Sequence, residues 1–117
     1  MRLSATKMIS TELATALQAA TAASEILLDY HKKRNAGRIE KKGRFDRVSD
    51  ADIESEKAIV QILQNTFPSY NINGEELGKQ SKGSEYTWFI DPLCGSNDFI
   101  RGFKDFGLSI ALVKDED

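Results

Sequence analysis

Acidic residues follow two short segments of this 117-residue chain that are predicted to be extended. Glu75 and Glu76 come after the extended piece 71–73, and Asp91 comes directly after the strand-forming run 87–90. A carboxylate at the end of a strand is an oxygen ligand of the kind that a hard cation such as Mg²⁺ prefers. The Glu pair taken alone indicates only a solvated loop, so the interpretation depends on what accompanies it.

The segment after Asp91 adds the features of a phosphate cradle. Pro92 fixes a turn, and Gly95 and Ser96 open a predicted turn and short helix over 95–102. Backbone N–H groups at the start of a helix suit a phosphate. A metal beside a phosphate cradle is typical of phosphoryl transfer to water. The alternative is an ordinary strand, turn and helix in which Ser96 only caps the helix.

Two helices are predicted before these segments. Helical spacing of apolar residues predicts the first helix over about 10–34 and a second helix further along the chain. Pro68 is expected to end the second helix at about Thr66. Ser49, with Asp52 three residues later, resembles a capping box at the start of the second helix.

The rest of the chain is expected to be strands and loops. Residues 77–85 form a predicted polar loop, and the strand over 87–90 is expected to stop at Asp91 and Pro92. The other extended segments are expected at 38–40, 71–73 and 108–113. Helices followed by strands predict an α+β fold with two N-terminal helices packed on a mostly antiparallel sheet.

Composition excludes several classes of protein. Sixteen basic against eighteen acidic residues give a formal net charge of −2, which argues against a nucleic-acid partner. No apolar run approaches the roughly 20 residues of a membrane helix, so no membrane partner is expected. The one cysteine, Cys94, excludes an internal disulfide framework and favours a cytoplasmic location. The length fits one domain over 1–117.

Several motifs occur together in one order, which makes them far more specific than any one alone. They are DRVSDAD at 46–52, FP at 67–68, GEE at 74–76, WFIDPLCGS at 88–96 and SIAL at 109–112. In this order they resemble the inositol monophosphatase family of Mg²⁺-dependent phosphatases, whose motifs read D-x-V-T-x-A-D, F-P, G-E-E, W-x-I-D-P-L-D-G-T and S-I-A-L. The resemblance covers about 42–113.

The resemblance implies a fold and an activity. The fold would be the N-terminal part of a layered αβαβα sugar-phosphatase fold, with 1–117 a single, incomplete domain. The activity would be metal-dependent hydrolysis of a small phosphate monoester, with Mg²⁺, or alternatively Mn²⁺, as cofactor. Inositol phosphate, sugar bisphosphates, histidinol phosphate and phosphoadenosine phosphate are the candidate substrates, and a small phosphorylated metabolite is the expected partner.

The resemblance also implies metal ligands. Glu75 and Asp91 correspond to carboxylate ligands, and Leu93 would lend its backbone carbonyl. Cys94 stands where the family has a second loop aspartate, and a thiolate is a soft ligand that suits Mg²⁺ poorly. A subfamily variant, a degenerate site and a sequence error are the three explanations of Cys94, and the first is favoured because the rest of the motif is intact.

The implied catalytic residues are Asp52, Glu75 and Ser96. Ser96 stands where the family has threonine, and its hydroxyl would orient a metal-held water, with Asp52 hydrogen-bonded to that hydroxyl. Gly95 and Ser96 would bind the phosphate.

Two rivals to a phosphatase remain. One is a non-catalytic, truncated relative that binds metal or phosphate or acts by association. The other is a small binding module whose motifs are coincidental. The strand at 108–113 is expected to have an open edge, which favours association of copies of the chain.

Overall fold

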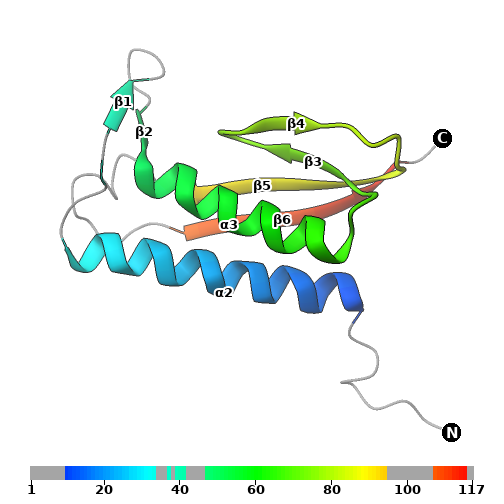
Figure 1. Ribbon diagram of the computed structural model, residues 1–117, viewed down its shortest axis with the longest axis horizontal. Helices are drawn as coiled ribbons and strands as arrows, with labels where there is room; N and C mark the ends of the chain where they lie inside the picture. Colours follow the sequence, from blue (N-terminus) through cyan, green and yellow to red (C-terminus); the bar gives the residue numbers. More distant parts are fainter. Residues whose placement is uncertain (1–9, 34–36, 38, 42–46, 95–106, 116–117) are drawn as a thin grey trace, which may run out of the picture.

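The computed structural model describes residues 10–33, 37, 39–41, 47–94 and 107–115. Two helices precede most of the sheet, as the order of the predicted elements requires (Figure 1). The helices are α2 (Thr11–Lys32) and α3 (Asp50–Thr66), and the strands are β1 (Ile39–Lys41), β2 (Arg47–Ser49), β3 (Asn71–Gly74), β4 (Gly78–Gln80), β5 (Tyr86–Cys94) and β6 (Gly107–Lys114).

Local capping sets the helix ends. Helix α2 begins after Ser10, whose Oγ accepts the Leu13 N–H at 3.0 Å. Helix α3 begins with the predicted capping box: the Ser49 N–H donates to Asp52 Oδ2 at 2.8 Å, and the Asp52 N–H donates to Ser49 Oγ at 3.4 Å. It ends at Thr66, as Pro68 predicts, so both helices lie within two residues of their expected bounds.

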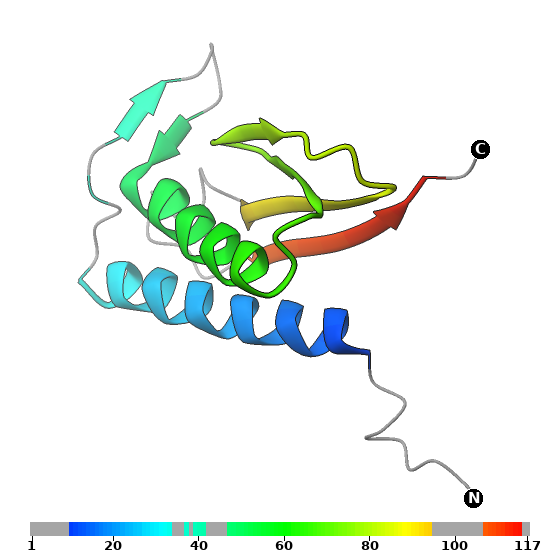
Figure 2. The same cartoon turned by 45° about the vertical axis from the view of Figure 1, so that its right-hand side comes forward.

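The main sheet has the strand order β4-β3-β5-β6, and β1 and β2 form a separate antiparallel pair. Of the four pairings among the described strands, three are antiparallel, and only β3 and β5 run parallel. The expectation of two helices on a mostly antiparallel sheet is therefore confirmed. Figure 2 shows β6 at the edge of the sheet, beside β5.

Two expectations about the strands are wrong. The predicted loop 77–85 contains β4, which forms a hairpin with β3 through a turn that ends at Gly78, where φ is +83°. Strand β5 does not stop at Asp91 but continues to Cys94. Pro92 is tolerated there because the β5–β6 register shifts between Asp91 and Cys94, so no ladder bond is needed from its nitrogen.

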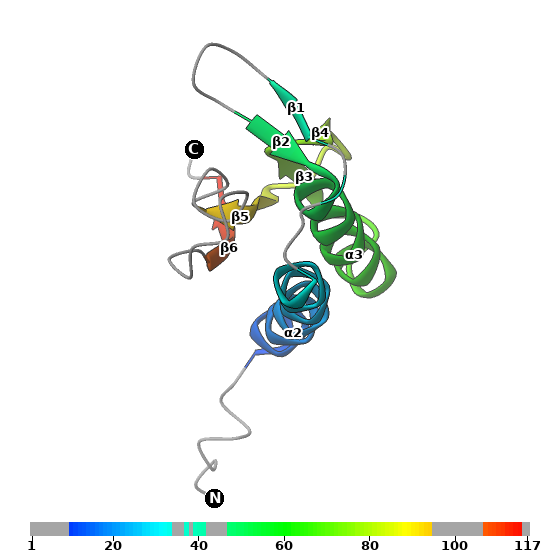
Figure 3. The same ribbon diagram turned by 90° about the vertical axis from the view of Figure 1, so that its left-hand side faces the viewer.

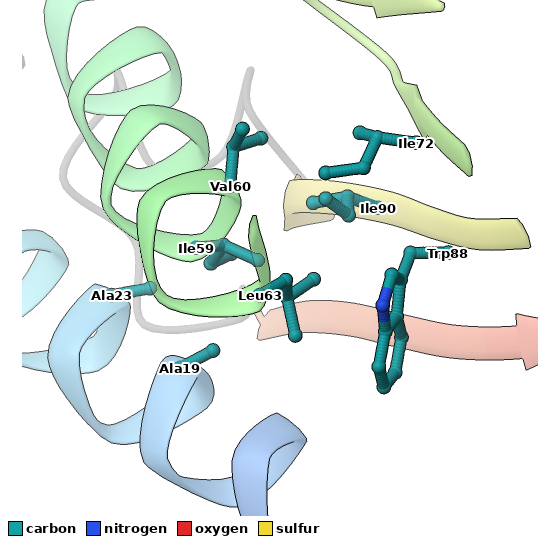
Figure 4. Close-up of a cluster of buried hydrophobic side chains, with 8 residues drawn as sticks. All are labelled: Ala19, Ala23, Ile59, Val60, Leu63, Ile72, Trp88 and Ile90. Carbon is teal, nitrogen blue, oxygen red and sulfur yellow. The ribbon is translucent and has the colours of Figure 1, made fainter. Parts of the chain in front are cut away.

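The core lies between the helices and one face of the sheet. Figure 3 shows α2 and α3 end-on, on the same side of the sheet. The sole tryptophan, Trp88, is 2% exposed and projects from β5 into this core. The buried cluster, drawn in Figure 4, consists of Ala19, Ala23, Ile59, Val60, Leu63, Ile72, Trp88 and Ile90.

The other face of the sheet is open. Alternate residues of a strand point to opposite faces, so the neighbour of Trp88, Phe89, points away from the helices and is 41% exposed. On β6, Val113 is 46% exposed in the same way.

Candidate metal centre

The parallel pairing of β3 and β5 brings Glu75 and Asp91 together. Gly74 is in register with Ile90, so the next residues of the two strands, Glu75 and Asp91, are neighbours at the same end of the ladder. The Glu75 N–H donates to the Ile90 carbonyl at 3.1 Å, which extends the ladder into the turn. Two acidic residues far apart in the sequence therefore share one edge of the structure.

The Asp91 carboxylate is held by its own turn. Its Oδ1 accepts the Leu93 N–H at 3.2 Å, a bond that bridges Pro92. Leu93 is 3% exposed and packs with Leu27 and Ala51, so this turn is anchored on both helices. Asp91 itself is only half-buried, while Glu75 is exposed. The side chains of Glu75 and Asp91 are thus both accessible to solvent.

Glu56 is a functional candidate that the sequence analysis missed. This residue of α3 is fully buried, and its carboxylate accepts the N–H groups of Glu76, at 2.9 Å, and Leu77. A Cβ added to Gly74 would lie only 2.7 Å from Glu56 Cδ, so the carboxylate is packed directly against that glycine. Helix α3 is therefore joined to the turn that carries Glu75.

The environment of Glu56 acts on its protonation in two directions. Burial raises the pKa of the Glu56 carboxyl above its usual value. The N–H groups of Glu76 and Leu77, and to a smaller extent that of Glu75, lower the pKa, and the nearby Glu76 carboxylate raises it. Burial is the largest of these effects, so the pKa of Glu56 is raised overall.

Asp52 is buried at the start of α3, 3% exposed. Its Oδ2 accepts both the N–H of Ser49 and the Ser49 hydroxyl, the latter at 2.6 Å. The partner that the family resemblance implies for Asp52 is Ser96, which lies outside the described residues together with Gly95. Cys94 ends β5, where it pairs with Gly107.

The donor atoms at the β3–β5 edge fit a hard cation. Glu75 and Asp91 offer carboxylate oxygens, and Leu93 offers a carbonyl oxygen, which is the chemistry that Mg²⁺ prefers. Within the described ranges, no group of three or more His, Cys, Asp or Glu side chains is gathered as a metal site. Among the described residues, Glu75 and Asp91 therefore form a neighbouring pair of acidic residues and not a larger cluster.

Two helices lie in the described part of the chain. Neither α2 nor α3 is long and apolar enough to cross a membrane.

Comparison with known proteins defines the class. The profile of the inositol monophosphatase family matches residues 8–117, and the chain belongs to that family. Among curated relatives, "Fructose-1,6-bisphosphatase/inositol-1-monophosphatase" of Aquifex aeolicus is 42% identical over 99 residues, covering 85% of this chain and 38% of the relative. "Nus factor SuhB" of Xylella fastidiosa is 40% identical over 98 residues, covering 84% of this chain and 35% of the relative.

Solved structures agree with this assignment. The extragenic suppressor protein suhB of Bartonella henselae superposes with a TM-score of 0.86 at 30% identity, over 90% of this chain and 41% of that one. The IMPase of Thermotoga maritima gives a TM-score of 0.80 at 30% identity, over 90% and 40% of the two chains. The fold expected from the resemblance is confirmed, and the chain spans well under half the length of the proteins it matches.

Proposed function

We propose that this chain supplies the metal-ligating carboxylates of a Mg²⁺-dependent phosphomonoesterase that acts on a small phosphorylated metabolite, such as inositol phosphate, in the cytoplasm. One observation carries the proposal: Glu75 and Asp91 are neighbours at one end of the β3–β5 ladder. Membership of the inositol monophosphatase family supports the reaction class.

Each residue of the site receives a role in this proposal. Glu75, Asp91 and the carbonyl of Leu93 hold Mg²⁺, or Mn²⁺ in its place. A cation bound there activates water and neutralises phosphate charge. Asp52, in addition to its bonds to Ser49, would accept a hydrogen bond from the Ser96 hydroxyl, so that this hydroxyl would orient the attacking water.

The phosphate is assigned to the backbone after β5. Gly95 and Ser96 would direct their N–H groups at the phosphate oxygens, as the first residues of a helix do. Positioning of this kind is most of what a protein contributes to phosphoryl transfer, because the charge is shared among the oxygens rather than carried by one atom.

A second candidate function is a non-catalytic family member that binds metal or phosphate. Two observations favour it: Cys94 stands in place of a ligand aspartate, and within the described ranges no three acidic, His or Cys side chains gather. The coding DNA after residue 117 separates the two candidates. An in-frame continuation with a tryptophan–aspartate motif favours the enzyme, and a stop codon favours the non-catalytic protein.

The metal centre is tested by titration calorimetry of the full chain with Mg²⁺ and with Mn²⁺. Asp91→Asn and Glu75→Gln remove one charge each and keep the shape. Changing a residue that only orients a metal ligand typically weakens binding by about ten- to a hundredfold. Because Glu75 and Asp91 are proposed as ligands themselves, we expect each substitution to weaken binding by at least about tenfold.

Glu85→Gln is the matched control, because Glu85 is an exposed carboxylate in the loop before β5. It should bind like the wild type. Equal binding by all four proteins would refute the assignment of Glu75 and Asp91 as ligands.

A further inference from the structure

We infer that Glu56 is a positioning residue for the metal centre: it fixes the backbone of residues 74–77 so that Glu75 is presented beside Asp91. The inference rests on the proposed function for the role of Glu75. The ordering of the turn itself rests only on contacts that the structure shows.

The Glu56 carboxylate lies in a buried position on α3. Glu56 is the only acidic side chain of α3, among the described residues, with no exposed surface. Burying a carboxylate is costly unless hydrogen bonds compensate for the lost water. The compensating donors are the N–H groups of Glu76 and Leu77 in the turn after β3.

The N–H groups of the turn are hydrogen-bonded to two different elements, β5 and α3. The Glu75 N–H is bound to β5, through the carbonyl of Ile90, and the next two N–H groups are bound to α3, through Glu56. Glu75 is thus held between two supports while its side chain is exposed. The backbone of this turn is already ordered in the folded protein, so cation binding does not have to order it and loses less conformational entropy.

Gly74, the residue before Glu75, is packed against Glu56. Any Cβ at Gly74 would overlap the Glu56 carboxylate, with Cδ only 2.7 Å away. The glycine of the Gly74-Glu75-Glu76 motif is therefore explained by Glu56: it leaves room for the carboxylate to reach the N–H groups beyond it.

The chemistry requires glutamate rather than glutamine at position 56. The two turn donors use different oxygens, Oε1 for Glu76 and Oε2 for Leu77. A carboxylate accepts at both oxygens, whereas an amide accepts at one and places an N–H₂ donor against the other N–H. Glu56→Gln therefore keeps the volume and removes one bond.

The test combines two measurements on the full chain: amide hydrogen exchange at Glu76 and Leu77, and calorimetric affinity for Mg²⁺ and Mn²⁺. In Glu56→Gln we expect exchange at these two amides to be at least about tenfold faster relative to core amides of β5. We expect cation affinity to fall by about ten- to a hundredfold, the usual loss when a residue that orients a ligand is changed.

Ser55→Ala is the matched control. Ser55 is the neighbouring residue of α3, is also fully buried, and bonds only within the helix in the described contacts, to the carbonyl of Ala51. This variant should lower overall stability without changing exchange at Glu76 and Leu77 or the cation affinity. A purely structural role for Glu56 would make the two variants behave alike, which would overturn the inference.

Gly74→Ala provides a second variant in case Glu56→Gln does not fold. It displaces the turn from the opposite side, because its methyl group meets the Glu56 carboxylate. We expect the same two changes, and wild-type exchange and affinity in this variant would overturn the inference. If the wild-type chain binds neither cation, the proposed function fails, and the exchange at Glu76 and Leu77 still decides whether Glu56 orders the turn.

Discussion

Cys94 is the residue at which this chain departs most clearly from its family's motif. Replacing its thiol with a carboxylate supplies a hard oxygen donor at the end of β5, so Cys94→Asp should strengthen Mg²⁺ binding by about tenfold, or 1.4 kcal/mol. Calorimetry with Mg²⁺ measures the change. Cys94→Ser is the control, since it removes sulfur without adding charge, and equal affinity in Cys94→Asp and Cys94→Ser would contradict this prediction.

Tyr30 offers a test of the packing between the two helices. Burial, first, and then the hydrogen bond to Glu54 raise the pKa of Tyr30 from 10.0 to about 12. Between these pH values the unfolded chain loses the Tyr30 proton and the folded chain keeps it, so this contribution to stability falls as pH rises. Phenolate absorbance should show a late step whose amplitude falls in Tyr30→Phe, and Tyr70, whose pKa is also raised by burial, accounts for the late absorbance that remains.

Glu54→Gln is the corresponding control for Tyr30. It should lower the pKa of Tyr30 toward 10.0 without reaching it, because burial is the larger cause of the raised pKa and stays in place. A step that is unchanged in Tyr30→Phe would assign it to another tyrosine.

At the residue scale, the sequence predicted the two carboxylates that follow strands, Glu75 and Asp91, and missed Glu56 in the middle of α3. Glu75 and Asp91 could be predicted because their positions after extended segments are local features. Glu56 could not, since a single glutamate in a helix is usually solvated. Its spacing was the available signal: Glu56 lies three and seven residues before Ile59 and Leu63, on the buried stripe of α3.

The start of α3 is an element whose stability can be measured directly. Ser49→Ala removes the side-chain half of the capping box and should cost about 1 kcal/mol, within the usual range of 0.5–2 kcal/mol. Urea unfolding followed by the fluorescence of Trp88, the only tryptophan, measures it. Ser10→Ala is the matched control at α2, where the cap is exposed, and it should cost less. A larger loss in Ser10→Ala would contradict the prediction.

At the element scale, helices were predictable and strand ends were not. Ser49, Asp52 and Pro68 set the bounds of α3 through contacts within a few residues. Strand β4, by contrast, has no alternation of apolar and polar residues and exists because β3 is beside it. The extension of β5 past Pro92 depends on the register shift against β6, which no local pattern encodes.

At the scale of the whole molecule, we predict that the 117-residue chain releases phosphate from inositol phosphate or fructose bisphosphate no faster with Mg²⁺ than without it. The described residues provide only two neighbouring carboxylates, Glu75 and Asp91, and each missing ligand is expected to cost orders of magnitude in rate. A phosphate-release assay tests this. A robust Mg²⁺-dependent rate that disappears in Glu75→Gln would show that the chain is sufficient for catalysis.

The overall architecture could be predicted from the sequence, whereas the association of copies of the chain is still to be tested. Two helices on a mostly antiparallel sheet could be predicted from the order of the elements. Association of copies through β6 stays a prediction: among the described strands this strand pairs only with β5, and Val113 beside the open edge is 46% exposed.

The single parallel ladder among the described strands, between β3 and β5, has a consequence for the stability of the fold. Glu75 and Asp91 are neighbours only while that ladder exists, so a cation that requires both binds the native chain and not the unfolded one. At a free concentration one hundred times its dissociation constant, such a cation adds about 2.7 kcal/mol to the free energy of unfolding. The ionic composition of the surrounding medium would then determine what fraction of the molecules is unfolded at equilibrium, and a chain moved into a chelating solution would lose this contribution to its stability.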